Sequence, residues 1–185
     1  ALPQGNAALS PHAIAQGLGL VLAGADPDGE AAAELRRVLR ATGTTEEALT
    51  ALNALDQLLT SRTGQGRSGS FKLRSAHAVW ARRDKPPAAP YLDALATHFG
   101  ASVRLVDFAG DAADARTSIN QSVTQALGEE LDDLGRSGEL GGDAALVVLS
   151  AASWNAAWQT PFEVNLTTPG RFGAQGEGAL TVPTM

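Results

Sequence analysis

The chain has 185 residues, of which 44% are hydrophobic and 18% charged, with a formal net charge of -6 and no cysteine. This composition is typical of a folded globular protein and long enough for one domain with a real core. It excludes a disulfide framework and a thiolate metal site, and the acidic balance argues against nucleic acid as a partner. No apolar run reaches the roughly 20 residues of a membrane span, and residues 1–9 lack the pattern of a signal peptide.

Helix signals dominate residues 10–60, which we take as the helical part of the chain. Ser10 followed by Pro11 is a typical helix start, because serine caps the first turn and proline there loses no hydrogen bond. Asp26-Pro27 repeats the pattern, and Thr44 or Thr45 caps a third helix. Helical spacing predicts three inward stripes: Ile14, Leu18, Val21 and Leu22; Leu35, Val38 and Leu39; and Leu52, Leu55 and Leu59.

Residues 61–70 read SRTGQGRSGS, which predicts a polar loop. Gly64, Gly66 and Gly69 have the spacing of a dinucleotide-binding fingerprint. Such a fingerprint follows a strand and opens a helix, so that the helix N-terminus meets the pyrophosphate. Here it follows a helix and leads into a strand-like segment, so a plain loop is the favoured interpretation.

Residues 71–134 alternate strands and helices. We expect a strand over 71–82, a helix over 90–100 that is stopped by a glycine, and a strand over 102–108. A long amphipathic helix is expected over 111–134, ending at Gly135. Its inward stripe consists of Ile119, Val123, Leu127, Leu131 and Leu134.

The run LVVLSAASW at Leu146–Trp154 is apolar at both odd and even positions. Because side chains alternate across a strand, both faces of this segment must be covered, which predicts a central strand over 145–155. Val147, Leu149 and Ala151 would face one layer, and their neighbours the other. Residues 165–185 hold two short strands separated by a turn. The expected fold class is α+β.

The local motifs and their order resemble the serpin family over nearly the entire chain. GNAALSPHAI at 5–14, THFGASVRLVDF at 97–108 and Ile119-Asn120 with Val123 are similar to the family's patterns. So are the apolar strand at 146–154, WQTPF at 158–162 and VPTM at 182–185. Each motif alone is weak, but their order and gaps are specific.

The resemblance implies a serpin-like fold of several helices packed on a large mixed β-sheet, incomplete here, with residues 1–185 forming a partial domain. It implies a serine protease inhibitor, with a cysteine protease as the other possible target, that takes a cleaved reactive loop into its sheet. The remaining half of the domain, with the loop, would be its other partner, and the location would be extracellular or at the cell surface. The resemblance assigns sheet opening to Ser10, Pro11, Asn120, Ser150 and Trp158, and it implies no catalytic, cofactor or metal residue.

Three positions depart from the family pattern. Ser150 stands where the family has asparagine, Ala13 where it has a second serine, and residues 127–130 read LGEE instead of a Thr-x-Gly-Lys pattern. The details of the hydrogen bonds beneath the sheet are therefore expected to differ.

Two other classes stay open. A hydrolase could draw on His12, His77 and His98, but neither a G-x-S-x-G elbow nor an H-E-x-x-H pair is present, and His12 and His98 are more typical of surface or packing residues. A non-inhibitory serpin relative, acting as a carrier or binding module, would differ in the loop hinge. The third helix is acidic, which argues against activation by heparin-like polyanions.

Overall fold

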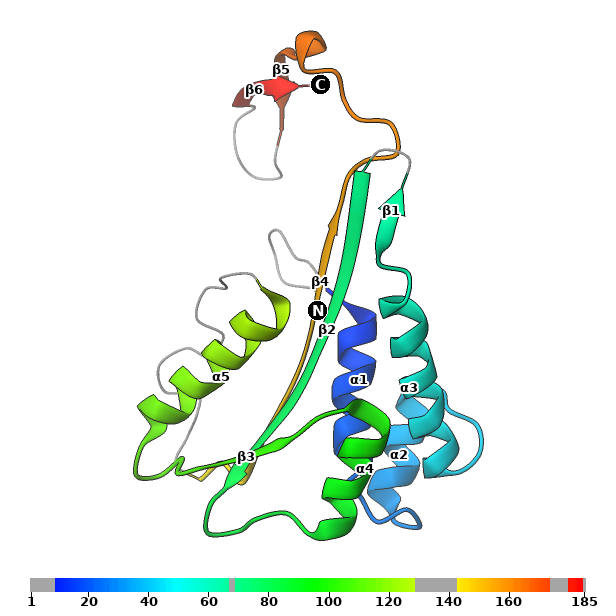
Figure 1. The fold of residues 1–185 in the computed structure, drawn as a ribbon, viewed down its shortest axis with the longest axis vertical. Helices are drawn as coiled ribbons and strands as arrows, with labels where there is room; N and C mark the ends of the chain where they lie inside the picture. Colours follow the sequence, from blue (N-terminus) through cyan, green and yellow to red (C-terminus); the bar gives the residue numbers. More distant parts are fainter. Residues whose placement is uncertain (1–8, 67–68, 129–142, 174–179, 185) are drawn as a thin grey trace.

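The computed structural model describes residues 9–66, 69–128, 143–173 and 180–184. It consists of five α-helices, one short 3-10 helix and six strands over these residues (Figure 1). The α+β class expected from the sequence is confirmed. In chain order the elements are α1 (Pro11–Leu22), α2 (Glu30–Val38), α3 (Thr45–Thr60), β1 (Gly64–Gly66), β2 (Gly69–Arg82), α4 (Ala89–Phe99), β3 (Val103–Val106), α5 (Ala112–Leu127), β4 (Leu146–Ala156), η1 (Val164–Leu166), β5 (Thr168–Phe172) and β6 (Leu180–Thr184).

The main sheet is organised around β2 and not around β4. β2 pairs with β4 in antiparallel register from Phe71↔Ala156 to Ala81↔Leu146. Its other edge pairs with β1 near one end and with β3, in parallel, near the other end. β4 forms the strand predicted over 145–155, and within the described residues it pairs only with β2, which leaves its second edge free; its central position in a complete sheet stays a prediction.

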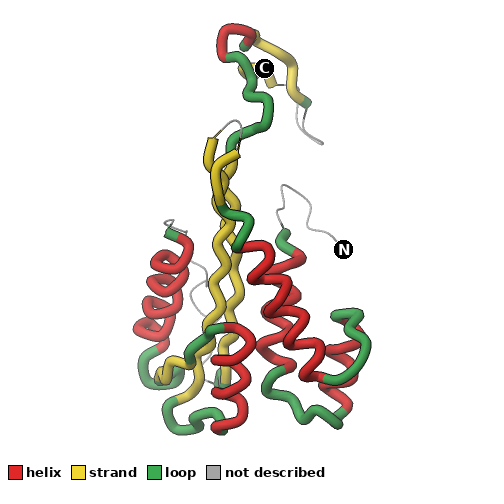
Figure 2. Tube along the Cα trace, turned by 45° about the vertical axis from the view of Figure 1, so that its right-hand side comes forward, coloured by secondary structure: helices red, strands yellow, loops and turns green. Residues whose placement is uncertain are grey.

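Helices cover both faces of the paired strands β2 and β4. Figure 2 shows α5 on one side of the sheet and α1 to α4 on the other. Val147 and Leu149 pack with the core around Trp80 and Phe108 beneath α5, whereas Val148 packs with Leu20 on the α1 side. The predicted two-sided coverage of β4 is confirmed, including the alternation of its side chains.

The helix starts follow local capping chemistry. The hydroxyl of Ser10 accepts a hydrogen bond from the amide of Ala13, as predicted for the cap of α1. Thr44 forms a capping box with Glu47, in which each side chain bonds the other residue's amide. Asp26 does not cap α2, because its carboxylate accepts from Asp28 within a turn and the helix begins three residues beyond Pro27, with Gly29 at its cap.

Left-handed glycines end two helices. Gly100 (φ +57°) stops α4, as predicted. Gly128 (φ +68°) stops α5 at Leu127, so the predicted unbroken helix over 111–134 is wrong at this glycine, and residues 129–134 lie outside the described part. The predicted stripe residues Leu131 and Leu134 lie outside the described residues.

The segment expected to be a loop at 61–70 contains β1, whose residues pair with the start of β2. Gly69 begins a strand and no helix follows it, so the glycine spacing has no helix N-terminus to offer a phosphate. Near the other end of the chain, β5 and β6 pair as an antiparallel hairpin, as expected from the sequence. None of the described helices is long and apolar enough to cross a bilayer.

Candidate functional site beneath the β2 and β4 strands

The first feature of the site is the free edge of β4. Eleven residues of this strand pair with β2 along one edge, and its second edge has no strand beside it in the described part of the chain. A free edge presents a row of backbone N–H and C=O groups that can pair with another extended segment. Because helices cover both faces, such a segment would find its side chains accommodated above and below the sheet.

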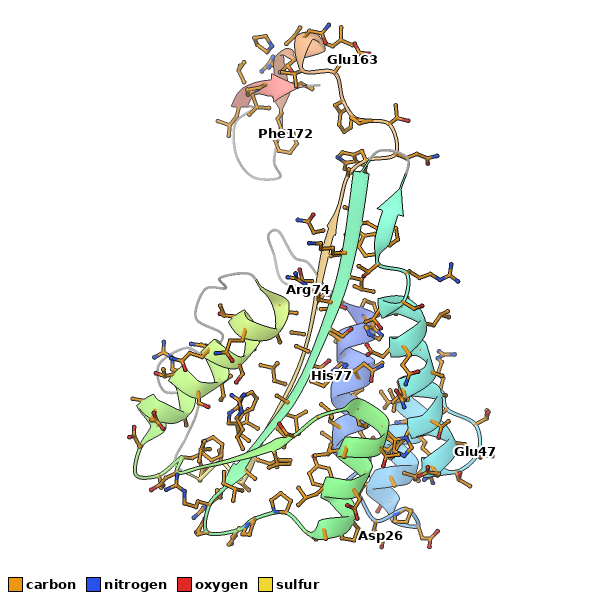
Figure 3. The ribbon with its side chains drawn as sticks, viewed as in Figure 1. Asp26, Glu47, Arg74, His77, Glu163 and Phe172 are labelled. Atoms are coloured by element: carbon orange, nitrogen blue, oxygen red, sulfur yellow. The ribbon has the colours of Figure 1, made fainter. Side chains whose placement is uncertain are left out.

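The second feature is a side-chain hydrogen bond that joins the two strands. His77 of β2 and Ser150 of β4 stand directly opposite each other in the strand register. Nδ1 of His77 lies 3.1 Å from Oγ of Ser150, on the face that α1 covers (Figure 3). Helix α1 passes close by, since a Cβ on Gly17 would lie 3.7 Å from Cβ of Ser150.

Asp56 of α3 brings a carboxylate to this pair. Its Oδ1 lies 2.9 Å from Nε2 of His12, which comes from α1, and 3.5 Å from Nε2 of His77. The first distance is that of a hydrogen bond, in which the ring N–H donates to the carboxylate. The second is an electrostatic contact. We call His12, Asp56, His77 and Ser150 the histidine cluster, and it joins α1, α3, β2 and β4.

Burial sets the protonation of the cluster. The side chain of His77 is 6% exposed, and this burial lowers its pKa below the usual value. The charge of Asp56 acts in the opposite direction but is outweighed, and His12 adds to the lowering. For Asp56, burial acts to raise the pKa, yet the Ser75 hydroxyl, the His12 ring and the charge of both imidazoles outweigh it, so the pKa lies below its usual value of 3.8.

The contacts run from Ser150 to His77 and from His77 to Asp56, as in the triad of a hydrolase, but their geometry does not fit acyl transfer. A hydrolase serine stands exposed on a sharp turn, beside donors that hold the oxyanion. Ser150 instead lies in the middle of a strand and below a helix. The arrangement is therefore suited to fastening two strands and two helices together.

A cavity of about 320 Å³ lies beside the cluster, along the edge of β2 between β1 and β3. Asp56, Ser75 and His77 line it from one side of the sheet, and residues of α5 line it from the other. Arg104 of β3 also lines it, and its guanidinium stacks 6.0 Å from the centre of the Trp80 ring. No group of three or more metal-ligating side chains is found among the described residues.

The structure places the five residues predicted from the resemblance in different surroundings. Ser10 and Pro11 form the start of α1, and Ser150 meets the same helix at Gly17, about 10 Å further along its axis at 1.5 Å per residue. Asn120 is half-buried on α5, across the sheet from the cluster. Ser150 alone of the five belongs to the histidine cluster.

Trp158, to which the resemblance assigns sheet opening, lies outside the core of the described residues. Its ring is 69% exposed and contacts Phe162 edge to face, with 5.8 Å between ring centres. The reason is its position two residues beyond the end of β4.

The sequence did not single out Asp56 as a site residue, and it did not connect His12 with His77. His12 and His98 were interpreted as surface or packing residues; the side chain of His12 is 15% exposed, and that of His98 is buried beside Glu46, so packing is correct for both. A signal for Asp56 was present. It stands four residues after Leu52 and three before Leu59, so a carboxylate occupies a position of the apolar stripe of α3.

Comparison with known proteins places this geometry in a family. A family model described as "Serpin (serine protease inhibitor)" matches residues 1–185. The chain is 32% identical to serpin-Z6A of Oryza sativa subsp. japonica over 167 residues, which is 90% of this chain and 41% of the relative. It is 27% identical to Serpin B4 of Homo sapiens over 181 residues, covering 91% of this chain and 45% of that protein.

Solved structures agree on the fold. The native stressed conformation of Arabidopsis AtSerpin1 superposes with a TM-score of 0.82 at 19% identity, covering 97% of this chain and 44% of the other. Native protease nexin-1 with heparin superposes with a TM-score of 0.77 at 27% identity, over 98% of this chain and 46% of the other. The chain spans less than half the length of these relatives.

Proposed function

Because this chain belongs to the serpin family, we propose that it is a portion of a serine protease inhibitor that acts by taking a cleaved reactive loop into its main sheet. Serpins are themselves the type example of such strand addition and of stored strain released by it. Members of the family are in general protease inhibitors and not enzymes. In this proposal β4 forms one wall of the slot that the loop enters.

The observation that carries the proposal is the free edge of β4. An inserted strand gains backbone hydrogen bonds along its length only if the accepting edge is unpaired and long enough. β4 offers eleven residues, and helices close both faces beside that edge. The histidine cluster holds the opposite edge of β4 to β2, which supports a rigid wall on that side.

The partners follow from the same proposal. The chain spans less than half of the relatives it matches, so the second wall of the slot and the reactive loop would come from the remaining half of a serpin domain. The target would be a serine protease, with a cysteine protease as the other candidate, outside the cell or at its surface. Sheet opening would involve Ser10, Pro11, Asn120, Ser150 and Trp158.

The test is an inhibition assay on the longer protein that carries residues 1–185. We expect a complex that survives denaturing electrophoresis with at least one of a trypsin-like, a chymotrypsin-like or a subtilisin-like protease. We also expect the loop-cleaved protein to unfold at a higher temperature than the intact one, because insertion adds a strand. The 185-residue chain alone is the control and should trap none of these proteases.

The competing function is a non-inhibitory serpin that serves as a carrier or binding module. Such a protein would be cut by the proteases as an ordinary substrate and would leave no covalent complex. Cleavage without a complex and without a gain in unfolding temperature would overturn the inhibitor proposal.

A further inference from the structure

The histidine cluster joins the one described strand partner of β4 to the helices below it. His77 reaches Ser150 on β4 through Nδ1 and faces Asp56 on α3 through Nε2. His12 on α1 donates to the same carboxylate. Since His77 and Ser150 are also register partners, any change at the His77 ring acts directly on the pairing of β2 with β4.

The hydrogen-bond donors and acceptors around the His77 ring favour its uncharged form. Its Nε2 has no hydrogen-bond partner among the described residues, and Asp56 lies at 3.5 Å. With Nδ1 unprotonated, the ring accepts the Ser150 O–H. A protonated ring has two N–H donors, so Ser150 must reverse its role and accept, while the buried charge faces Asp56 at 3.5 Å, whose carboxylate already accepts from His12.

The surrounding charges offer little compensation for that proton. Within the described ranges, Asp56 from α3 is the one carboxylate at the ring, and it already accepts from His12 of α1. β3 contributes Arg104 to the same cavity, which is a further positive charge. From α4 the ring meets only the edge of Phe99, at 6.2 Å between ring centres. β4 contributes the neutral hydroxyl of Ser150.

We propose that His77 is an acid-operated release for strand β4: protonation places an incompletely compensated charge between the paired strands and favours separation of β4 from β2 and α1. The proposal rests on the proposed function, since it assigns a regulation to the strand that would border the loop slot. It concerns the edge of β4 that pairs with β2, however, and its test needs no protease.

The direction of the effect follows from linkage. Burial holds the pKa of His77 in the folded state below the value in an unfolded chain, so opening takes up a proton. The pairing is therefore strongest above the unfolded-state value of about 6.5 and weakens as pH falls from there toward the folded-state pKa. Within that window the opening constant rises by up to about tenfold for each pH unit, because one proton is involved.

The experiment is hydrogen exchange followed by mass spectrometry on the 185-residue chain, from about pH 7.5 to about pH 5, corrected for intrinsic exchange rates. We expect protection of peptides covering Leu146–Ala156 to fall through this range. Protection of the β5–β6 hairpin, which does not contact the cluster, should not follow the same curve. Unchanged protection of β4 across the range would overturn the proposal.

Matched variants identify the residue. His77→Asn retains a polar side chain without a titrating ring and should abolish the pH dependence of β4 protection. His98→Asn removes a histidine that is buried to the same extent but pairs with Glu46 away from β4, and should leave the dependence intact. Asp56→Asn removes the charge that favours the protonated ring and so lowers the folded-state pKa of His77 further; the fall should begin at the same pH and extend to lower pH.

A second measurement covers the case in which His77→Asn does not fold. The ring proton resonances of the histidines in the unaltered chain can be titrated by NMR. We expect the resonance of His77 in the folded chain to titrate at the acid end of the pH range over which β4 protection falls, because the folded-state pKa sets that end. A persistent fall in the His77→Asn variant, or a ring that titrates outside that range, would refute the release, whereas a failed protease assay would refute only the inhibitor function.

Discussion

Trp80 is the largest side chain in the core, and its surroundings make it the residue on which the sheet and α5 most depend. Its ring is 0% exposed, and Nε1 donates to the hydroxyl of Ser118 at 3.2 Å. Trp80→Ala should lower the free energy of unfolding by about 3 to 5 kcal/mol, because it leaves a cavity and an unpaired hydroxyl. Denaturant unfolding followed by circular dichroism measures the change.

Trp154 provides the matched control for Trp80. It is 66% exposed and stacks on Phe71, with 6.0 Å between ring centres. Trp154→Ala should therefore change the free energy of unfolding by about 1 kcal/mol or less. Equal losses for the two tryptophans would contradict the assignment of Trp80 to the core beneath α5.

Asp56 predicts how the chain responds to strong acid. Its pKa is lowered in the folded state, so its contribution to stability is present above the unfolded-state value and is lost as pH falls below 3.8 toward the folded-state pKa. Asp56→Asn should flatten the decline of unfolding free energy in that acidic range. The control is Asp84→Asn, at an exposed carboxylate paired with Arg82 and far from the cluster, which should leave the contribution of Asp56 intact.

At the residue scale, sequence patterns predicted alternation and caps but not the cluster. Ser10 as a cap and Gly100 as a helix stop follow from local chemistry that the chain carries within a few residues. The meeting of His12, Asp56 and His77 depends on the packing of three elements far apart in sequence. No spacing rule connects them, because the contacts span 44 and 21 residues, the latter from 56 to 77.

Helix α1 shows why inward stripes were predicted less well than helix positions. Its buried residues are Gln16, Gly19, Leu20 and Leu22, whereas Ile14 and Val21 are exposed. The side that faces inward is chosen by α3 and the sheet: Gln16 donates to the carbonyl of Leu52, and a Cβ on Gly19 would lie 2.5 Å from the Leu52 side chain. Two residues of the other predicted inward stripes, Val38 and Leu55, were also expected inside and are exposed.

Gly100 offers a prediction at the scale of an element, since it ends α4 with φ +57°. A Cβ there would meet nothing within 4 Å, so the cost of substitution is confined to the backbone conformation. Gly100→Ala should lower the free energy of unfolding by about 1 kcal/mol, and Gly100→Asn by less, because asparagine tolerates the left-handed region. Thermal unfolding of both variants is the measurement, and an equal or larger loss for asparagine would contradict the conformational cause.

At the scale of the whole molecule, the described residues leave large apolar side chains exposed at separate places. Ile14 and Val21 expose one side of α1, and the segment after β4 exposes Trp158, Phe162 and Val164. Such exposed apolar side chains, together with a strand edge that is free in the described part of the chain, are typical of surfaces that another segment covers. The molecule thus has the surface of a domain portion whose counterpart covers these residues in the proposed complete serpin.

The isolated chain should therefore self-associate as its concentration rises, which sedimentation velocity can follow. Val164→Lys should reduce the association, because it places a charge in the apolar patch at a side chain that is 82% exposed. Glu163→Lys changes the charge at the neighbouring exposed position and serves as the control for charge alone. A chain that stays monomeric across the concentration range would contradict the prediction.

Trp158 distinguishes the isolated chain from the complete domain. Its exposed ring contacts Phe162 here, so Trp158→Ala in the 185-residue chain should change the free energy of unfolding by about 1 kcal/mol or less. In the longer protein, where the proposed second half covers the end of β4, the same substitution should cost about 3 to 5 kcal/mol, as for a buried tryptophan. Paired denaturant titrations of both lengths test this difference. Equal effects in the two contexts would mean that nothing covers this end of β4, and the ring would then have no part in the opening of the sheet.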